Sequence, residues 1–194
     1  MRIFTIIIFV ISFLFTGTGF AKQSGAYIGG SFGGTTFEDD NRFSDIGLNI
    51  DDKDRGGQLF GGFNFNRYIG VEGTLASLGE YSDTTGLYKD SFGAFTVTAV
   101  GKLPVGRGPV SFYGKAGLGI ISWEEDTFFG LTQSDTGGTV TIGLGVMFTP
   151  GTESYLTFRL GWDFYTFAME ETTPPFRDYN QTLGLGSLGL QFNF

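Results

Sequence analysis

The chain has 194 residues, a formal net charge of −8, 33 Gly, 23 Phe, 8 Tyr and 2 Trp, and neither Cys nor His. Absent Cys excludes disulfides and thiolate metal sites, and absent His removes the usual general base and the commonest metal ligand. The length corresponds to one domain. Without these side chains we expect no enzymatic activity, no catalytic residues, no metal and no cofactor. The acidic balance also argues against nucleic acid as a partner.

Residues 1–21 have the layout of a secretory signal peptide. A basic start, Met1-Arg2, precedes the apolar run Ile3–Phe15, and Gly19-Phe20-Ala21 offers small residues for cleavage. The apolar run is too short for a membrane anchor, which needs about 20 residues. We expect an exported chain whose mature domain covers 22–194.

Beyond residue 21, large apolar side chains alternate with small or polar ones in segments bounded by Gly, Asn, Asp or Pro. This period of two predicts β-strands, and the high Gly and aromatic content favours strands over helices. The clearest segment places Leu156, Phe158 and Leu160 opposite Thr157 and Arg159. Eight strands are predicted, at 26–36, 58–66, 69–78, 92–103, 110–123, 139–149, 155–165 and 183–194.

The last predicted strand contains two patterns. From Leu188 to Phe194 the large apolar residues are even-numbered and share one face of the strand, whereas Leu183 and Leu185 are odd-numbered and fall on the other face. A β-bulge at Gly186 or Ser187 is predicted, because one extra residue would bring all of them to the same face. The final residues resemble the terminal strand of bacterial outer-membrane β-barrels, which the insertion machinery reads through alternating hydrophobics and a final Phe. The resemblance implies a barrel-closure and insertion signal formed by Leu190, Phe192 and Phe194.

The connections alternate in length. Those near 67, 104–109 and 150–154 are short, whereas 37–57, 79–91, 124–138 and 166–178 are long and carry most of the acidic residues. Short turns at one rim and long loops at the other are typical of an eight-stranded antiparallel up-and-down transmembrane β-barrel. We expect the long loops to be extracellular.

Alternation alone would also fit a soluble barrel with its apolar face inward. The polar parity is built from Gly, Ser, Thr and Asn, whereas a water-exposed face usually carries many Lys and Glu. Small polar residues suit the narrow interior of an eight-stranded barrel, so we predict that the apolar parity faces lipid. Phe65, Phe112, Phe148 and Phe194 are then expected to form an aromatic girdle at the short-turn rim.

Segments 25–33, 60–73 and 113–119, with the terminal strand, resemble the OmpA-type eight-stranded outer-membrane β-barrel family of small porin-like proteins. The most telling piece is Gly-Val-Glu-Gly at 70–73. The resemblance implies a multi-pass protein of the Gram-negative outer membrane that contacts lipid, lipopolysaccharide and the insertion machinery. Larger family members continue into a peptidoglycan-binding domain, whereas this sequence stops at Phe194. We therefore do not expect cell-wall tethering.

Five charged residues occupy the lumen parity of the strands: Glu72, Lys102, Lys115, Arg159 and Asp163. We expect a fixed ion network that fills the barrel, because side chains leave little room for a water column in so narrow a barrel. The alternative is an ion pathway or a gate in which Glu72 changes partner. The family resemblance implies a lumen ion cluster around the matching Glu and leaves conduction open.

The loops suggest two further sites. Acidic residues at 38–40 and 51–55 could bind a divalent cation, but they lack EF-hand spacing, so we expect a solvated loop. Aromatic residues in the predicted loops fit an adhesive surface or an anchor at the outer membrane interface, and both interpretations stay open. They are Trp123, Phe128, Phe129, Phe167 and Phe176.

The functional prediction is a structural or surface-interaction protein of adhesin-like type. It would be a monomer that displays acidic loops to a host or cell-surface ligand on a barrel plugged by lumen side chains. The alternatives are a narrow, low-conductance pore and a lipid-modifying barrel enzyme, which the absence of His disfavours.

Overall fold

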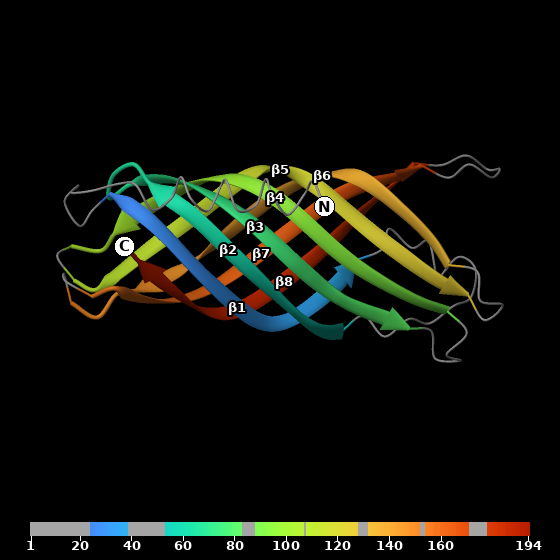
Figure 1. Cartoon of the computed structure of the whole chain (residues 1–194), viewed down its shortest axis with the longest axis horizontal. Helices are drawn as coiled ribbons and strands as arrows, with labels where there is room; N and C mark the ends of the chain where they lie inside the picture. Colours follow the sequence, from blue (N-terminus) through green and yellow to red (C-terminus); the bar gives the residue numbers. More distant parts are fainter. Residues whose placement is uncertain are drawn as a thin grey trace, which may run out of the picture.

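The chain forms one closed antiparallel β-barrel (Figure 1). The computed structural model describes residues 24–38, 53–82, 88–106, 108–127, 132–151, 154–170 and 178–194. The strands are β1 (Gly25–Glu38), β2 (Lys53–Asn64), β3 (Ile69–Ser82), β4 (Tyr88–Pro104), β5 (Val110–Thr127), β6 (Thr132–Phe148), β7 (Leu156–Glu170) and β8 (Asp178–Asn193). Each strand pairs with the next, and β1 pairs with β8. The predicted eight-stranded up-and-down barrel is confirmed.

The two rims of the barrel differ. The short-turn rim carries the connections 65–68, 105–109 and 149–155, and the opposite, long-loop rim carries 39–52, 83–87, 128–131 and 171–177. None of the described residues forms a helix long and apolar enough to cross a membrane. The expected signal peptide, 1–21, lies outside the described residues.

All four expected long connections are shorter than predicted, because the strands continue into them. Asp126 still pairs with Thr132 across β5 and β6, and Tyr88 pairs with Thr127 across β4 and β5. The sequence there is polar, so the apolar alternation that marks a membrane-facing strand is missing even though the backbone ladder continues. The strands therefore have 12 to 18 residues, more than the roughly 9–11 that a membrane crossing requires.

The predicted bulge in β8 is wrong. Strand β8 pairs with β1 from Tyr27↔Asn193 to Glu38↔Thr182 without a shift, and its pairing with β7 is equally continuous. Leu183 and Leu185 instead point into the barrel, where both are fully buried. The parity of β8 does not have to change, because the lumen itself is apolar at this height.

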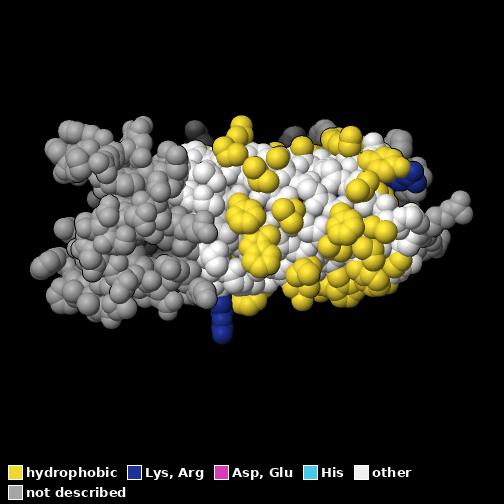
Figure 2. All heavy atoms as spheres, turned by 180° about the vertical axis from the view of Figure 1, so that it is seen from behind, with side chains coloured by type: hydrophobic (Ala, Val, Ile, Leu, Met, Phe, Trp, Pro, Cys, Tyr) yellow, Lys and Arg dark blue, Asp and Glu magenta, His cyan; other side chains and the backbone are white. Residues whose placement is uncertain are grey.

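The outer wall is apolar, as predicted. Figure 2 shows hydrophobic side chains spread over the described wall, basic side chains towards its ends, and no acidic side chain on this face. The expected girdle residues Phe65, Phe112, Phe148 and Phe194 are all exposed on the wall near the short-turn rim. Other exposed wall residues are Ile28, Phe32, Leu59, Leu75, Val97, Leu103, Leu118, Ile142, Leu160 and Leu188. Such a wall fits the hydrocarbon layer of a membrane.

Candidate functional site

The middle of the lumen is crossed by a charged cluster centred on Glu72, a fully buried residue of β3. Its Oε2 accepts hydrogen bonds from Arg159 at 2.6 Å and from the Tyr27 hydroxyl at 3.0 Å. Its Oε1 accepts a hydrogen bond from Lys115 Nζ at 3.2 Å. These donors come from β7, β1 and β5, so one carboxylate connects strands that are not neighbours in the sheet.

A second buried carboxylate, that of Asp163 on β7, completes the cluster. Its Oδ2 lies 3.2 Å from Lys115 Nζ and accepts a hydrogen bond from Gln58 Nε2 at 2.9 Å. Gln58 in turn accepts a hydrogen bond from the Tyr165 hydroxyl at 3.3 Å. Lys115 therefore bridges the two carboxylates. We call Glu72, Lys115, Arg159 and Asp163 the charged belt.

A glycine on β6 makes room for the Lys115–Asp163 ion pair. Gly143 is the register partner of Lys115 on one side and of Asp163 on the other. A Cβ added at Gly143 would collide with the Asp163 carboxylate and would lie 2.8 Å from Lys115 Cε. Any larger residue here would push the two charges apart.

Arg159 is also held by aromatic rings. Its guanidinium carbon lies 4.2 Å from the centre of the Phe60 ring and 4.7 Å from that of Tyr113. Such cation–π contacts gain strength when water is excluded. Its Nη1 also donates to Gln191 Oε1 at 3.5 Å. The charged belt is thus a dense network in which Asp163 Oδ1 is buried without a hydrogen-bond partner. The described residues contain no group of three or more potential metal ligands.

The structure brings together four of the five expected network residues and places the fifth apart. Lys102 forms no ion pair with any described carboxylate; its Nζ donates to Asn64 Oδ1 at 2.5 Å and lies 5.3 Å from the centre of the Tyr27 ring. Sequence reasoning missed the uncharged members of the network, although their lumen parity could have indicated them. They are Tyr27, Gln58, Phe60, Tyr113 and Gln191.

Above the charged belt, towards the long-loop rim, the lumen is filled by an apolar cluster that we call the plug. Its buried members are Ala76, Leu78, Phe92, Ala94, Ile121, Tyr165, Phe167, Leu183 and Leu185, and Trp123 packs against them. The Trp123 and Phe167 rings stack with centroids 6.0 Å apart.

The plug corrects part of the expected aromatic loop surface. Trp123 and Phe167 belong to strands and pack inside the lumen, so neither forms an adhesive loop surface or an outer anchor. The sequence prediction missed the lumen position of Trp123 and Phe167, because it expected the interior of the barrel to be polar along its whole length. Phe128, Phe129 and Phe176 lie outside the described residues, as does 39–52 of the acidic first loop.

The comparisons with known proteins agree with this architecture. The model of the outer membrane protein β-barrel domain matches residues 7–192. No curated protein sequence matches the chain. Neisserial surface protein A is similar in structure at 12% identity, with a TM-score of 0.67 over 88% of this chain and 99% of that one.

Two further solved structures are similar. Ail, the attachment invasion locus protein of Yersinia pestis, solved with the heparin analogue sucrose octasulfate, is 20% identical, with a TM-score of 0.57 over 90% of this chain and 100% of Ail. OprG of Pseudomonas aeruginosa is 13% identical, with a TM-score of 0.53 over 89% of this chain and 96% of OprG. At such identities the likeness shows a shared fold. Because the domain model covers nearly the whole chain, the protein belongs to the outer membrane protein β-barrel family.

Proposed function

We propose that this protein is a closed outer-membrane barrel that presents its long-loop rim at the cell surface for interaction with other surfaces. The observation that carries the proposal is the filled lumen, where the charged belt is followed by the plug. A barrel of this kind serves as a scaffold for what its rim displays.

The filling of the lumen argues against a pore. An ion that entered from the short-turn rim would meet Glu72, Lys115 and Arg159 already paired, with side chains that are at most 4% exposed. It would then have to cross the plug, where Leu78, Ile121 and seven other buried side chains form a mainly apolar layer. Moving an ion through such an apolar layer is expensive, because nothing replaces its hydration shell.

The charge distribution supports a basic partner at the long-loop rim. Seventeen of the 20 Asp and Glu residues fall in 38–55, 80–90, 124–135 and 170–178, with five of the 12 Lys and Arg residues. These segments form the strand ends and connections of that rim. An acidic rim attracts cationic patches and repels polyanions. The proposed ligand class therefore differs from the sulfated sugar that was solved with Ail.

The proposed protein is exported and inserted into the outer membrane with its long-loop rim outwards. The signal peptide 1–21 directs export, the insertion machinery reads Leu190, Phe192 and Phe194, and lipid and lipopolysaccharide cover the apolar wall. The long-loop rim lies outside a Gram-negative cell and the short-turn rim faces the periplasm. The barrel acts as a monomer without cofactor or catalysis, in keeping with the absence of His.

Conductance in planar bilayers tests the closed lumen. Purified full-length barrel is expected to give no stepwise current over a range of voltages, whereas a pore-forming barrel measured in parallel gives steps. Reproducible steps from the folded protein would favour the pore and overturn the closed barrel.

Binding of barrel-containing liposomes to charged surfaces tests the displayed rim. We expect retention on polylysine, release by moderate salt, and no retention on heparin. A matched variant with Asp39, Asp40, Asp51 and Asp52 changed to Asn should bind polylysine more weakly. Equal binding of both proteins, or retention on heparin, would contradict the proposed partner class.

A further inference from the structure

A cavity opens at the short-turn rim, at the opposite end of the lumen from the plug. It has a volume of about 410 Å³ and is lined by residues of β1, β2 and β4 to β8 and their turns. Its polar lining includes Asn64, Lys102, Ser111, Thr157, Gln191 and Asn193. We call it the mouth cavity. Its volume lies in the usual range for small-molecule sites, about 300–1,000 Å³.

Between the plug and the short-turn rim, the lumen carries more positive than negative side-chain charge. The described strands point three cations inward there, Lys102, Lys115 and Arg159, and two carboxylates, Glu72 and Asp163, whereas the inward carboxylate of Asp54 lies near the long-loop rim. Both carboxylates are engaged by the charged belt. Lys102 is left with a neutral partner. A half-buried ammonium without a counter-charge favours an anion beside it.

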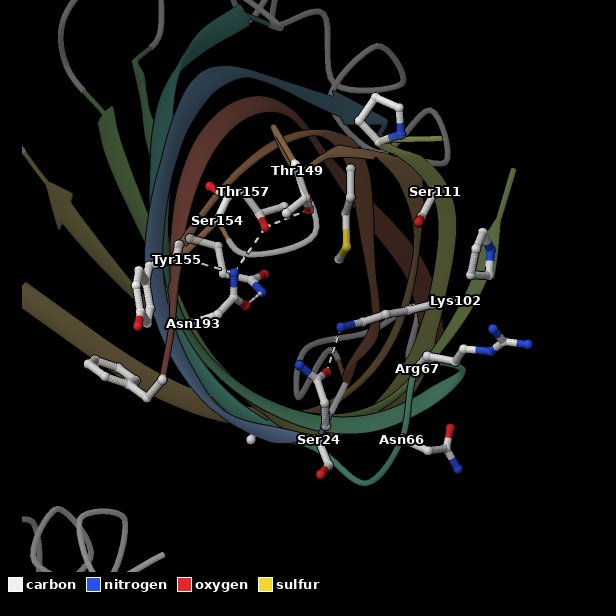
Figure 3. Close-up of a pocket in the computed structure, with 18 of the residues that line it drawn as sticks. Ser24, Asn66, Arg67, Lys102, Ser111, Thr149, Ser154, Tyr155, Thr157 and Asn193 are labelled. Atoms are coloured by element: carbon white, nitrogen blue, oxygen red, sulfur yellow. Dashed lines mark hydrogen bonds between the residues drawn. The ribbon is translucent and has the colours of Figure 1, made fainter. Parts of the chain in front are cut away.

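The geometry around Lys102 is open towards the cavity. Figure 3 shows its side chain reaching from one wall into the opening, with Thr157 and Asn193 on the opposite wall. An ammonium group has three N–H donors, of which one is directed to Asn64. No Asp or Glu side chain is among the described residues that line the cavity.

The neighbouring Arg67 does not share this arrangement. It points away from the opening in Figure 3, and its guanidinium contacts the ring and hydroxyl of Tyr68. Arg67 is exposed, so water already solvates its charge. Among the described residues of this rim, Lys102 and Arg67 therefore provide a matched pair: both line the cavity, but Lys102 reaches into it and Arg67 is turned towards solvent.

We propose that the mouth cavity is a binding site for a small carboxylate- or phosphate-bearing molecule, with Lys102 as the charged anchor. The neutral side chains around it contribute hydrogen bonds: the Ser111 hydroxyl lies on the same side as Lys102, and Thr157 and Asn193 lie across the opening. Asn193 already donates to the Thr157 hydroxyl at 3.0 Å, which orients that wall. The site binds from the compartment that the short-turn rim faces, and it does not depend on the surface role of the other rim.

Titration of the refolded full-length barrel tests the site. Inorganic phosphate and acetate, each compared with chloride at constant ionic strength, are followed by backbone amide NMR shifts. We expect saturable shifts at Asn64, Ser111 and Thr157. The tighter of the two anions identifies the preferred head group. Shifts that do not saturate, or that occur only at the long-loop rim, would overturn the proposal.

Variants of the two rim cations provide the second measurement. Lys102→Met should weaken phosphate or acetate binding about tenfold or more, the loss expected for one charge-assisted hydrogen bond, and Lys102→Arg should retain most of it. Arg67→Met should bind like the unaltered protein. Equal weakening by Lys102→Met and Arg67→Met would mean general electrostatic attraction and no built site. The titration of the unaltered barrel tests the site without any variant, so poor folding of one variant does not decide whether the cavity binds an anion.

Discussion

Glu72 is the residue on which the interior depends, because three donors from three other strands converge on its carboxylate. In the buried interior of the barrel, removing one partner of an ion pair leaves the other charge uncompensated. Arg159 would be left in that state, because Lys115 keeps its ion pair with Asp163.

Replacing Glu72 by Gln should therefore destabilise the barrel by about 3–5 kcal/mol, the usual cost of breaking a buried pair. Urea unfolding in liposomes, followed by Trp fluorescence, measures the change. Lys102→Met is the matched control, since Lys102 forms no ion pair with a described carboxylate and should cost much less. If both variants unfold at the same urea concentration, the charged belt does not stabilise the fold.

The same Glu72→Gln variant separates a fixed network from a gate. With a fixed network, the plug still closes the lumen, so planar-bilayer recordings should stay silent. A gate controlled by Glu72 would instead show new or longer openings in the variant.

Gly143 offers a test of the Lys115–Asp163 ion pair that removes no charge. A methyl group at Gly143 would collide with Asp163, so Gly143→Ala should destabilise by about 1–3 kcal/mol, as overpacking usually does. Gly138→Ala on the same strand is the control, because nothing lies within 4 Å of a Cβ there. Equal stability of the two variants in urea would show that the pair relaxes without cost.

At the scale of the strands, the sequence predicted the face of each residue better than its depth or its partners. Lipid requires an apolar outer face along the whole crossing, so alternation located every strand. The same alternation says nothing about height in the lumen. Lys102 lies two residues from the end of β4 and Lys115 five residues inside β5, which is why only Lys115 joins the charged belt.

Apolar residues that face the lumen account for two errors of the sequence prediction. The parity of Leu183 and Leu185 predicts a bulge, and Trp123 and Phe167 are predicted in loops, whereas in the structure all four residues pack in the plug. The polar ends of β4, β5 and β6 have a separate cause, since a strand that water surrounds keeps its backbone ladder without apolar alternation.

Cysteine cross-linking tests the continuous register of β8. The protein has no Cys, so introduced pairs are unambiguous. Thr36 lies opposite Gly184 across the β1–β8 seam. The pair Thr36→Cys with Gly184→Cys should form a disulfide efficiently under mild oxidation, and Thr36→Cys with Leu183→Cys should not. A bulge at Gly186 or Ser187 would reverse this preference.

At the scale of the whole molecule, closure between β1 and β8 should make the barrel resistant to detergent. Unboiled outer-membrane samples should migrate faster on SDS gels than boiled ones, because the closed sheet stays compact. Phe194 donates its backbone N–H to Ala26 at 2.9 Å while its ring lies exposed on the wall.

Phe194→Ala keeps that backbone bond and removes only the ring. If the ring serves as an insertion signal, the variant should refold normally in detergent yet yield less fast-migrating protein in cells. Normal yield in cells would exclude the signal role. A single band for both samples of the unaltered protein would contradict a detergent-resistant barrel.

In the closed barrel that we propose, the plug leaves the lumen open at one end only. Any solute that enters through the mouth cavity must then leave by the same opening, and the deeper groups can exchange protons or isotopes with only one of the two compartments that the membrane separates. Arg159 connects to that opening through Gln191, a residue of the cavity lining, whereas the plug closes the other direction. The interior therefore equilibrates with the medium at the short-turn rim and is insulated from changes in the medium on the other side.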